Sequence, residues 1–210
     1  MGKVSAWFPP LCGILFVVLI VVGFALSGDT PDATEDSAEE VLAHYVDDDD
    51  KIAVGSILIG LGCVFLLFFA GWLRKLLRDA EDEGGILSAV TFGGGVLAAV
   101  GFATAAAFSF AIADVADNIE DPVVFQTLNV LSWGYWIPIA AGVITFGVAA
   151  GISVVRHGAL PAWLGWVAIV AGVVMFSPAF IVAGPVLALW ILVVSVIGIQ
   201  RAGRGTAATA

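Results

Sequence analysis

Carboxylates gather at two places in the chain, and they are the residues best suited to chemistry. Asp47 to Asp50 form a run of four, and Asp114 and Asp117 lie one helical turn apart. Such oxygen ligands bind hard cations like Ca²⁺ or Mg²⁺. Neither place has the D-x-[DN]-x-[DN]-G spacing of a calcium loop, and a solvated run of charge explains the same residues. The weak cation candidates are Asp47, Asp48, Asp49, Asp50, Asp114 and Asp117.

A second candidate site combines Asp114 and Asp117 with polar residues that follow them. If the preceding helix continues past Ala113, these carboxylates would face the interior of a bundle. Ionisable groups at membrane depth are costly and usually functional. Together with Gln126, Asn129 and Tyr135 they could line a polar vestibule. Ordinary hydration of a helix end is the simpler explanation.

His44 stands beside Tyr45 and the aspartate run. Histidine titrates near neutral pH and could sense it. An exposed loop histidine without a partner is the more common situation.

The long apolar stretches carry almost no reactive groups. None has an Asp, Glu, Lys, Arg or His in its apolar middle, and there is no G-x-S-x-G, H-E-x-x-H or phosphate-loop motif. Cys12 and Cys63 both fall in apolar runs, and His44 and His157 lie in different loops. These four residues therefore do not provide the ligands of a zinc site. We therefore expect no enzyme, no catalytic residue and no cofactor.

Composition defines the class of protein. The chain has 210 residues, of which 60% are apolar and 12% are charged, whereas soluble domains are about 45–50% apolar. This predicts one all-α domain, residues 1–210, built as an integral membrane bundle of six transmembrane helices. The predicted spans are about 7–27, 52–73, 86–113, 131–155, 162–177 and 179–200.

Two details of this bundle stay open in the sequence. The first apolar run resembles a signal peptide, although 20 residues is long for one; cleavage would leave five spans. Residues 161–200 hold no charge, and the break between the last two spans falls at Pro178 or at Gly184-Pro185. With the break at Pro178, span 162–177 is short, so it either crosses a thin region or extends further.

Residues 28–51 form an acidic extracytoplasmic loop with ten carboxylates and one lysine. Ser37-x-x-Glu40 fits a capping box, and Val41, Leu42, Tyr45 and Val46 have helical spacing. We expect a short amphipathic helix lying on the membrane surface.

Charge also predicts the orientation. Six spans place seven of the eight basic residues on one side and fourteen of the eighteen carboxylates on the other. Short loops rich in Lys and Arg stay cytoplasmic, so both termini are expected inside.

Small residues mark the packing faces. Gly and Ala dominate residues 93–107, and Gly147 and Gly151 are spaced for close helix approach. We expect residues 86–113 to form the central packing helix. Such faces could also bind a membrane protein partner or form a homo-oligomer.

Several stretches together resemble a known group. They are GSILIGLGCVFLLFFAGWLRKLLRDAE, then TFGGGV, then Arg156, Gly158, Leu160, Pro161 and Trp163 to Trp166. This pattern resembles uncharacterised six-span integral membrane proteins common in actinobacteria. The resemblance covers most of the chain, and it implies a bacterial inner (plasma) membrane and no catalytic residue.

We expect a non-enzymatic multi-pass membrane protein that is structural or accessory in a membrane assembly. Its expected partner is the lipid bilayer, and we expect it to bind no nucleic acid. The alternative is a small channel or transporter for a neutral or weakly polar solute. A polar cavity between spans three and four, open to one side, would favour transport. A tightly filled bundle with an exposed small-residue face would favour assembly.

Overall fold

The computed structural model describes residues 6–32, 36–81, 84–119 and 121–207, and within these ranges it contains helices and no strands. The all-α prediction is therefore confirmed. The α-helices are α1 (Phe8–Ser27), α2 (Ala38–Asp47), α3 (Asp49–Arg78), α4 (Ile86–Asp114), α5 (Pro122–Ser132), α6 (Trp136–His157), α7 (Ala162–Val174) and α8 (Phe180–Ala207), with 3₁₀ turns η1 (Ala116–Asn118) and η2 (Trp133–Tyr135).

Among the described residues, five helical segments are long and apolar enough to cross a membrane: α1, α3, α4, the α5–α6 stretch Pro122–His157, and Phe180–Arg204 of α8. The fifth predicted span, 162–177, corresponds to α7, which has only 13 residues. At 1.5 Å per residue it is about 20 Å long, shorter than a hydrocarbon core of about 30 Å.

The chain turns between α7 and α8 at Ser177 and Pro178. The Ser177 hydroxyl donates to the Val174 carbonyl at 2.7 Å and accepts from the Ala179 amide at 3.2 Å. The competing break at Gly184-Pro185 does not occur, because Pro185 lies inside α8. Proline is tolerated there at the cost of one backbone bond, since it has no N–H to donate to the carbonyl of Ile181.

Close packing of α4 against α6 confirms the role predicted for the small residues. A Cβ on Gly94 would collide with the backbone of Phe146, and one on Gly142 with the backbone of Ala98. Gly151 likewise lies so near α7 that a Cβ would come within 2.5 Å of the Gly165 carbonyl. Small residues therefore let the backbones of these helices touch.

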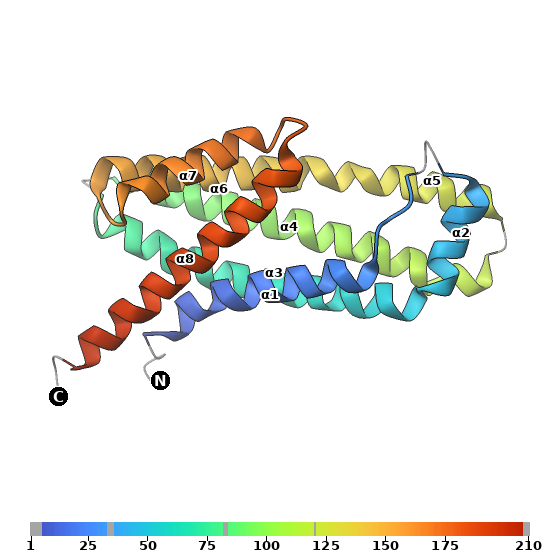
Figure 1. The fold of residues 1–210 in the computed structure, drawn as a ribbon, viewed down its shortest axis with the longest axis horizontal. Coiled ribbons are helices and arrows are strands. Elements are labelled where there is room, and N and C mark those ends of the chain that lie inside the picture. Colours follow the sequence, from blue (N-terminus) through green and yellow to red (C-terminus); the bar gives the residue numbers. More distant parts are fainter. Residues whose placement is uncertain (1–5, 33–35, 82–83, 120, 208–210) are drawn as a thin grey trace.

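One end of the bundle has a small core of its own, and we call it the cap: α2, η1 and α5 with the first turn of α3 and the last turn of α4 (Figure 1). The predicted capping box is present at the start of α2, where Ser37 and Glu40 bond each other's backbone amides. The expectation that the apolar face of this helix lies against the membrane is wrong. Val41 and Tyr45 are 0% and 2% exposed, because Phe125 and the end of α4 cover them.

The helix that follows the cap is longer than its predicted span. Span four was expected from about residue 131, whereas helical structure begins at Pro122 and runs through η2 into α6. Asp121 explains the start, since its carboxylate accepts from the Val123 amide at 3.0 Å and Pro122 suits a first helical turn.

Both termini lie at the end opposite the cap (Figure 1). The described basic residues other than Lys51 belong to segments at that end: Arg74, Lys75, Arg78, Arg156, Arg201 and Arg204. There Glu81 ties the α3–α4 loop to α6, because its carboxylate accepts from the Ser153 hydroxyl at 2.6 Å and the Ser88 amide at 3.3 Å.

Candidate functional site

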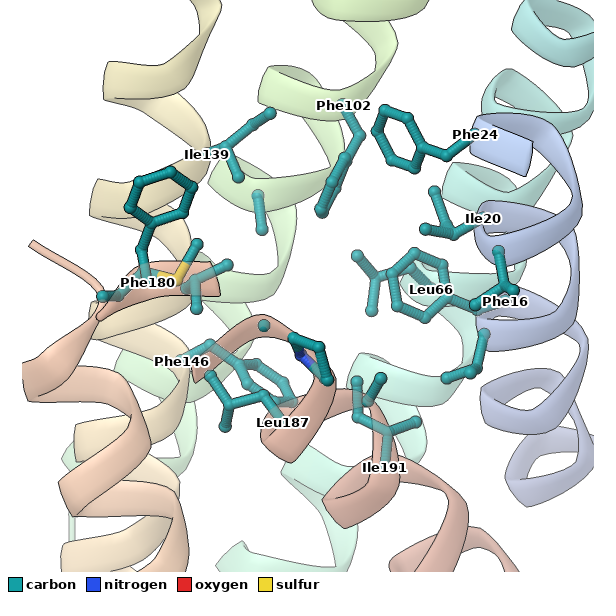
Figure 2. A pocket seen from close by; sticks show the side chains of 18 of the residues that line it. Phe16, Ile20, Phe24, Leu66, Phe102, Ile139, Phe146, Phe180, Leu187 and Ile191 are labelled. Atoms are coloured by element: carbon teal, nitrogen blue, oxygen red, sulfur yellow. The ribbon is translucent and has the colours of Figure 1, made fainter. Parts of the chain in front are cut away.

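A cavity of about 810 Å³ lies among α1, α3, α4, α6 and α8 (Figure 2). Phe16, Ile20 and Phe24 of α1 form one wall, and Phe180, Leu187 and Ile191 of α8 form part of another. The space exists partly because its floor is small, with Gly95 and Ala98 of α4 between larger neighbours. Gly184 of α8 also lines it, and a Cβ there would meet no atom within 4 Å.

The cavity is closed at the end away from the cap by a crossing of α1 and α8. There Gly13 lies against Ser195 and Phe69, and a Cβ on Gly198 would come within 2.8 Å of Pro10. The two helices diverge from this crossing toward the cap (Figure 1). Their separation leaves room for the cavity between them.

The side of the cavity between α1 and α8 is open to the surroundings. Three of its lining residues are themselves at the surface: Val21 is 57% exposed, Ile181 70% and Leu189 61%. All three lie in helices long and apolar enough to cross a membrane, so the opening lies on the apolar side of the bundle.

Aromatic rings limit the cavity at the cap end, and a short connection begins four residues after the last residue of α1 that lines the cavity. The rings of Trp136 and Phe180 lie 4.5 Å apart between α6 and α8. Residues 28–32, which we call the strap, lead from the end of α1 toward α5 (Figure 1). The strap is anchored where the Asn129 side-chain amide donates to the Pro31 carbonyl at 2.9 Å.

The lining is suited to hydrocarbon. Apart from Tyr135 and Trp136, both at the cap end, the lining residues are Gly, Ala, Pro, Met, Phe and branched aliphatic residues. Among them there is no carboxylate, imidazole, thiol or amine to act as base, nucleophile or metal ligand. Such a site can bind by shape and apolar contact and offers at most a phenol and an indole N–H for orientation.

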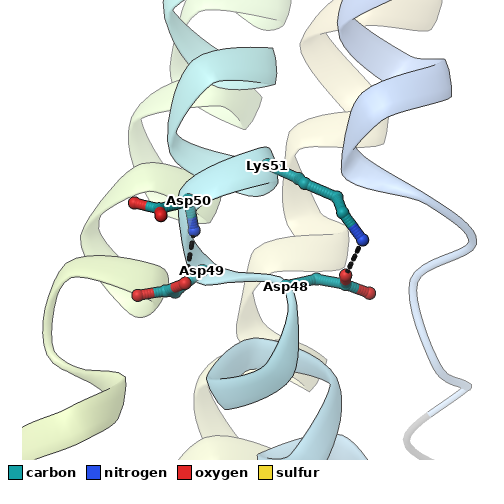
Figure 3. Close-up of polar contacts among 4 residues, drawn as sticks. All are labelled: Asp48, Asp49, Asp50 and Lys51. Atoms are coloured by element: carbon teal, nitrogen blue, oxygen red, sulfur yellow. Dashed lines mark hydrogen bonds and ion pairs between the residues drawn. The ribbon is translucent and has the colours of Figure 1, made fainter.

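The aspartate run does not converge on one point. The Asp48 carboxylate pairs with the Lys51 ammonium at 2.5 Å, while Asp49 accepts from the backbone amide of Asp50, and the side chains of Asp49 and Asp50 point away from Asp48 (Figure 3). The Lys51 contact lowers the pKa of Asp48. Within the described ranges, no three His, Cys, Asp or Glu residues group closely enough to hold a metal ion.

The second carboxylate pair ends α4. Asp114 is exposed at the last position of the helix, and Asp117 lies in η1 with a side chain outside the described residues. Asn129 is fully buried, and it bonds Tyr45 and Pro31. Tyr135 lines the apolar cavity instead, so these two residues do not form a polar vestibule.

His44 is half-buried rather than exposed. Its ring lies 5.2 Å from the Tyr45 ring in an edge-on arrangement. Burial lowers the pKa of His44, and the charge of Asp48 opposes this in part. Burial also raises the pKa of Tyr45 to about 12, with a smaller contribution from Tyr135, so Tyr45 remains a hydrogen-bond donor.

The sequence reasoning missed the cavity. Its apolar lining residues look like any membrane-spanning sequence, and the open space depends on the tilt of α8 against α1. Gly184-Pro185 was the available signal, since a glycine and a proline within an apolar helix often lie beside a binding site. That dipeptide was interpreted only as a possible break.

Comparison with known proteins gives a family. No curated protein and no solved structure matches the chain. The family described as a domain of unknown function, DUF4386, matches residues 11–201, from α1 into α8. This agrees with the resemblance to an uncharacterised group, and because the match covers nearly the whole chain, the protein belongs to the DUF4386 family.

Proposed function

We propose that this is a non-enzymatic, accessory membrane protein that binds an apolar, lipid-like molecule in the cavity between α1 and α8. One observation carries the proposal: a space of about 810 Å³ with an almost wholly apolar lining opens on the apolar side of the bundle, between helices long enough to cross a membrane. Ligand pockets in proteins commonly measure about 300–1,000 Å³. The residues that line this cavity offer binding without chemistry.

Physical reasons favour an occupied cavity. An empty space deprives the atoms around it of dispersion contacts. An apolar cavity of only about 150 Å³ already binds benzene. Hydrocarbon chains surround the protein at high concentration, whereas water gains few hydrogen bonds in such a site.

The proposed location is the bacterial inner (plasma) membrane, with both termini in the cytoplasm and the cap outside. The concentration of basic residues at the end opposite the cap supports this orientation. A reporter fused after Arg204 should give a cytoplasmic signal. An extracytoplasmic signal would reverse the proposed orientation.

The geometry gives less support to a channel or transporter for a polar solute. The cavity has two polar side chains, Tyr135 and Trp136, both at one end. An accessory role through a homo-oligomer or a membrane partner would need a free small-residue face. Gly94, Gly142 and Gly151 already pack within the chain, whereas Gly60 and Gly93 have open space around them.

Filling the cavity tests the proposal. Gly184→Leu and Ala188→Leu each place bulk in the lining. Gly93→Leu is the matched control, because its Cβ also has open space and it does not line the cavity. Purified protein should carry tightly bound lipid by native mass spectrometry, and the two filling variants should carry less than the control. Equal lipid content in all three variants would overturn the proposed function.

A further inference from the structure

We infer that the occupant is one hydrocarbon chain of a lipid in the leaflet on the cap side, and that this lipid has a neutral or zwitterionic headgroup instead of a net negative one. This inference rests on the proposed function and specifies its ligand. It draws on three observations: the depth of the cavity, its lateral opening and the charges around its cap end.

The depth of the cavity matches one leaflet. It follows α8 from Phe180 to Leu192, which is about 18 Å at 1.5 Å per residue. Half of a hydrocarbon core of about 30 Å is about 15 Å. The contact of Gly13 with Ser195 lies just beyond Leu192 and closes the site near the middle of the bundle. A chain inserted from the cap side can therefore lie along the cavity without reaching the opposite leaflet.

The lateral opening fixes the route of access. Val21 and Ile181 lie on α1 and α8 at the surface and also line the cavity. Between these helices a chain can move from the bilayer into the site while its headgroup stays in the interfacial region. Trp136 and Tyr135 lie at this level, where amphipathic aromatic rings are favoured.

Charge around the cap end selects the headgroup. The strap starts directly after α1 and carries the exposed carboxylate of Asp29. Within the described ranges, Lys51 is the one lysine or arginine of the cap side, and Asp48 already pairs with it. A headgroup with a net negative charge would meet an acidic surface without a cation to neutralise it. A headgroup that carries an ammonium group beside its phosphate can place this positive charge near the carboxylate of Asp29.

Competition between two lipids tests this inference. The protein is reconstituted with equal amounts of phosphatidylethanolamine and phosphatidylglycerol with identical chains, and retained lipid is measured by native mass spectrometry. A like-charge contact near a surface changes an equilibrium by about fivefold, so we expect at least that preference for phosphatidylethanolamine. Asp29→Lys should reduce the preference. Asp79→Lys, the same change on an exposed residue at the opposite end, should not.

The outcomes separate the inference from the proposed function. Equal retention of both lipids, or a preference for phosphatidylglycerol, overturns the headgroup selection even if Gly184→Leu still removes bound lipid. Unchanged lipid content in Gly184→Leu overturns the cavity as the binding site. A preference that Asp79→Lys changes as much as Asp29→Lys contradicts selection at the cap end.

Discussion

The hydroxyl of Tyr45 donates a hydrogen bond to Oδ1 of Asn129 at 3.2 Å, and 84 residues of chain separate the two. The same amide donates through Nδ2 to the Pro31 carbonyl. Tyr45 and Asn129 are both buried, at 2% and 0% exposure. One side chain therefore joins α2, α5 and the strap, which begins four residues after the last residue of α1 that lines the cavity.

Replacing this amide should loosen the cap. Asn129→Ala leaves the Tyr45 hydroxyl and the Pro31 carbonyl without this partner, at about 1–3 kcal/mol for a buried polar group. We expect a lower unfolding temperature and faster hydrogen exchange in residues 38–47. Thr127→Ala is the control on the same helix, because Thr127 is exposed and bonds only its own helix. Unchanged exchange in Asn129→Ala would show that the amide does not hold α2.

Local features of the fold could be predicted from the sequence. The Ser37–Glu40 capping box spans three residues, and Gly147 and Gly151 mark one face of one helix, so their spacing alone specifies them. In both cases a few adjacent residues contain the whole physical cause. Residue type also marked Pro178 as a break, but Gly184-Pro185 carried the same signal, and the sequence did not decide between them.

Features that join distant segments could not be predicted in this way. Asn129 looked like part of a polar vestibule, whereas its partners are Tyr45 and Pro31, from segments far away in the chain. The spacing of Val41 and its apolar neighbours correctly predicted the apolar face of α2. The same spacing could not show whether lipid or protein covers that face. The cavity depends on how α8 crosses α1, and residue spacing along either helix does not contain that angle.

Two adjacent glycines in α4 should respond differently to the same substitution. A Cβ on Gly94 would overlap the backbone of Phe146, whereas a Cβ on Gly93 would meet nothing within 4 Å. Overpacking of this kind costs about 1–3 kcal/mol, so Gly94→Ala should lower the unfolding temperature clearly. Gly93→Ala should leave it unchanged or raise it, because alanine favours helix more than glycine does. Equal effects would contradict the close α4–α6 approach.

Trp190 should tie α8 to α7. Its indole N–H donates to the Leu164 carbonyl at 2.8 Å, and the side chain is 1% exposed. Trp190→Phe removes this hydrogen bond, worth about 0.5–1.5 kcal/mol, and leaves unfilled volume. The variant should therefore unfold at a lower concentration of a denaturing detergent. Trp163→Phe serves as the control because Trp163 is 58% exposed. A loss of stability of the same size in the control would argue against a specific tie.

Mild acid should destabilise the cap through His44. Burial lowers the pKa of His44 below its ordinary value of 6.5, so the unfolded chain binds the proton more readily than the folded cap. The contribution of neutral His44 to the stability of the cap is complete above about pH 7.5. It falls as the pH drops through 6.5 toward the lower pKa that His44 has in the folded protein. Hydrogen exchange in residues 38–47 should therefore be faster at pH 5.5 than at pH 7.5, after correction for the intrinsic rate.

Two variants identify the group responsible for this pH response. His44→Gln should remove most of it, while His157→Gln should preserve it, because His157 lies at the other end of the bundle beside Ser153. The carboxylate of Glu40 titrates at a lower pH, because its hydrogen bond with the Ser37 backbone amide lowers its pKa. Its contribution to the stability of the cap is therefore lost only below about pH 4.5. A pH response that persists in His44→Gln would place the proton elsewhere in the cap.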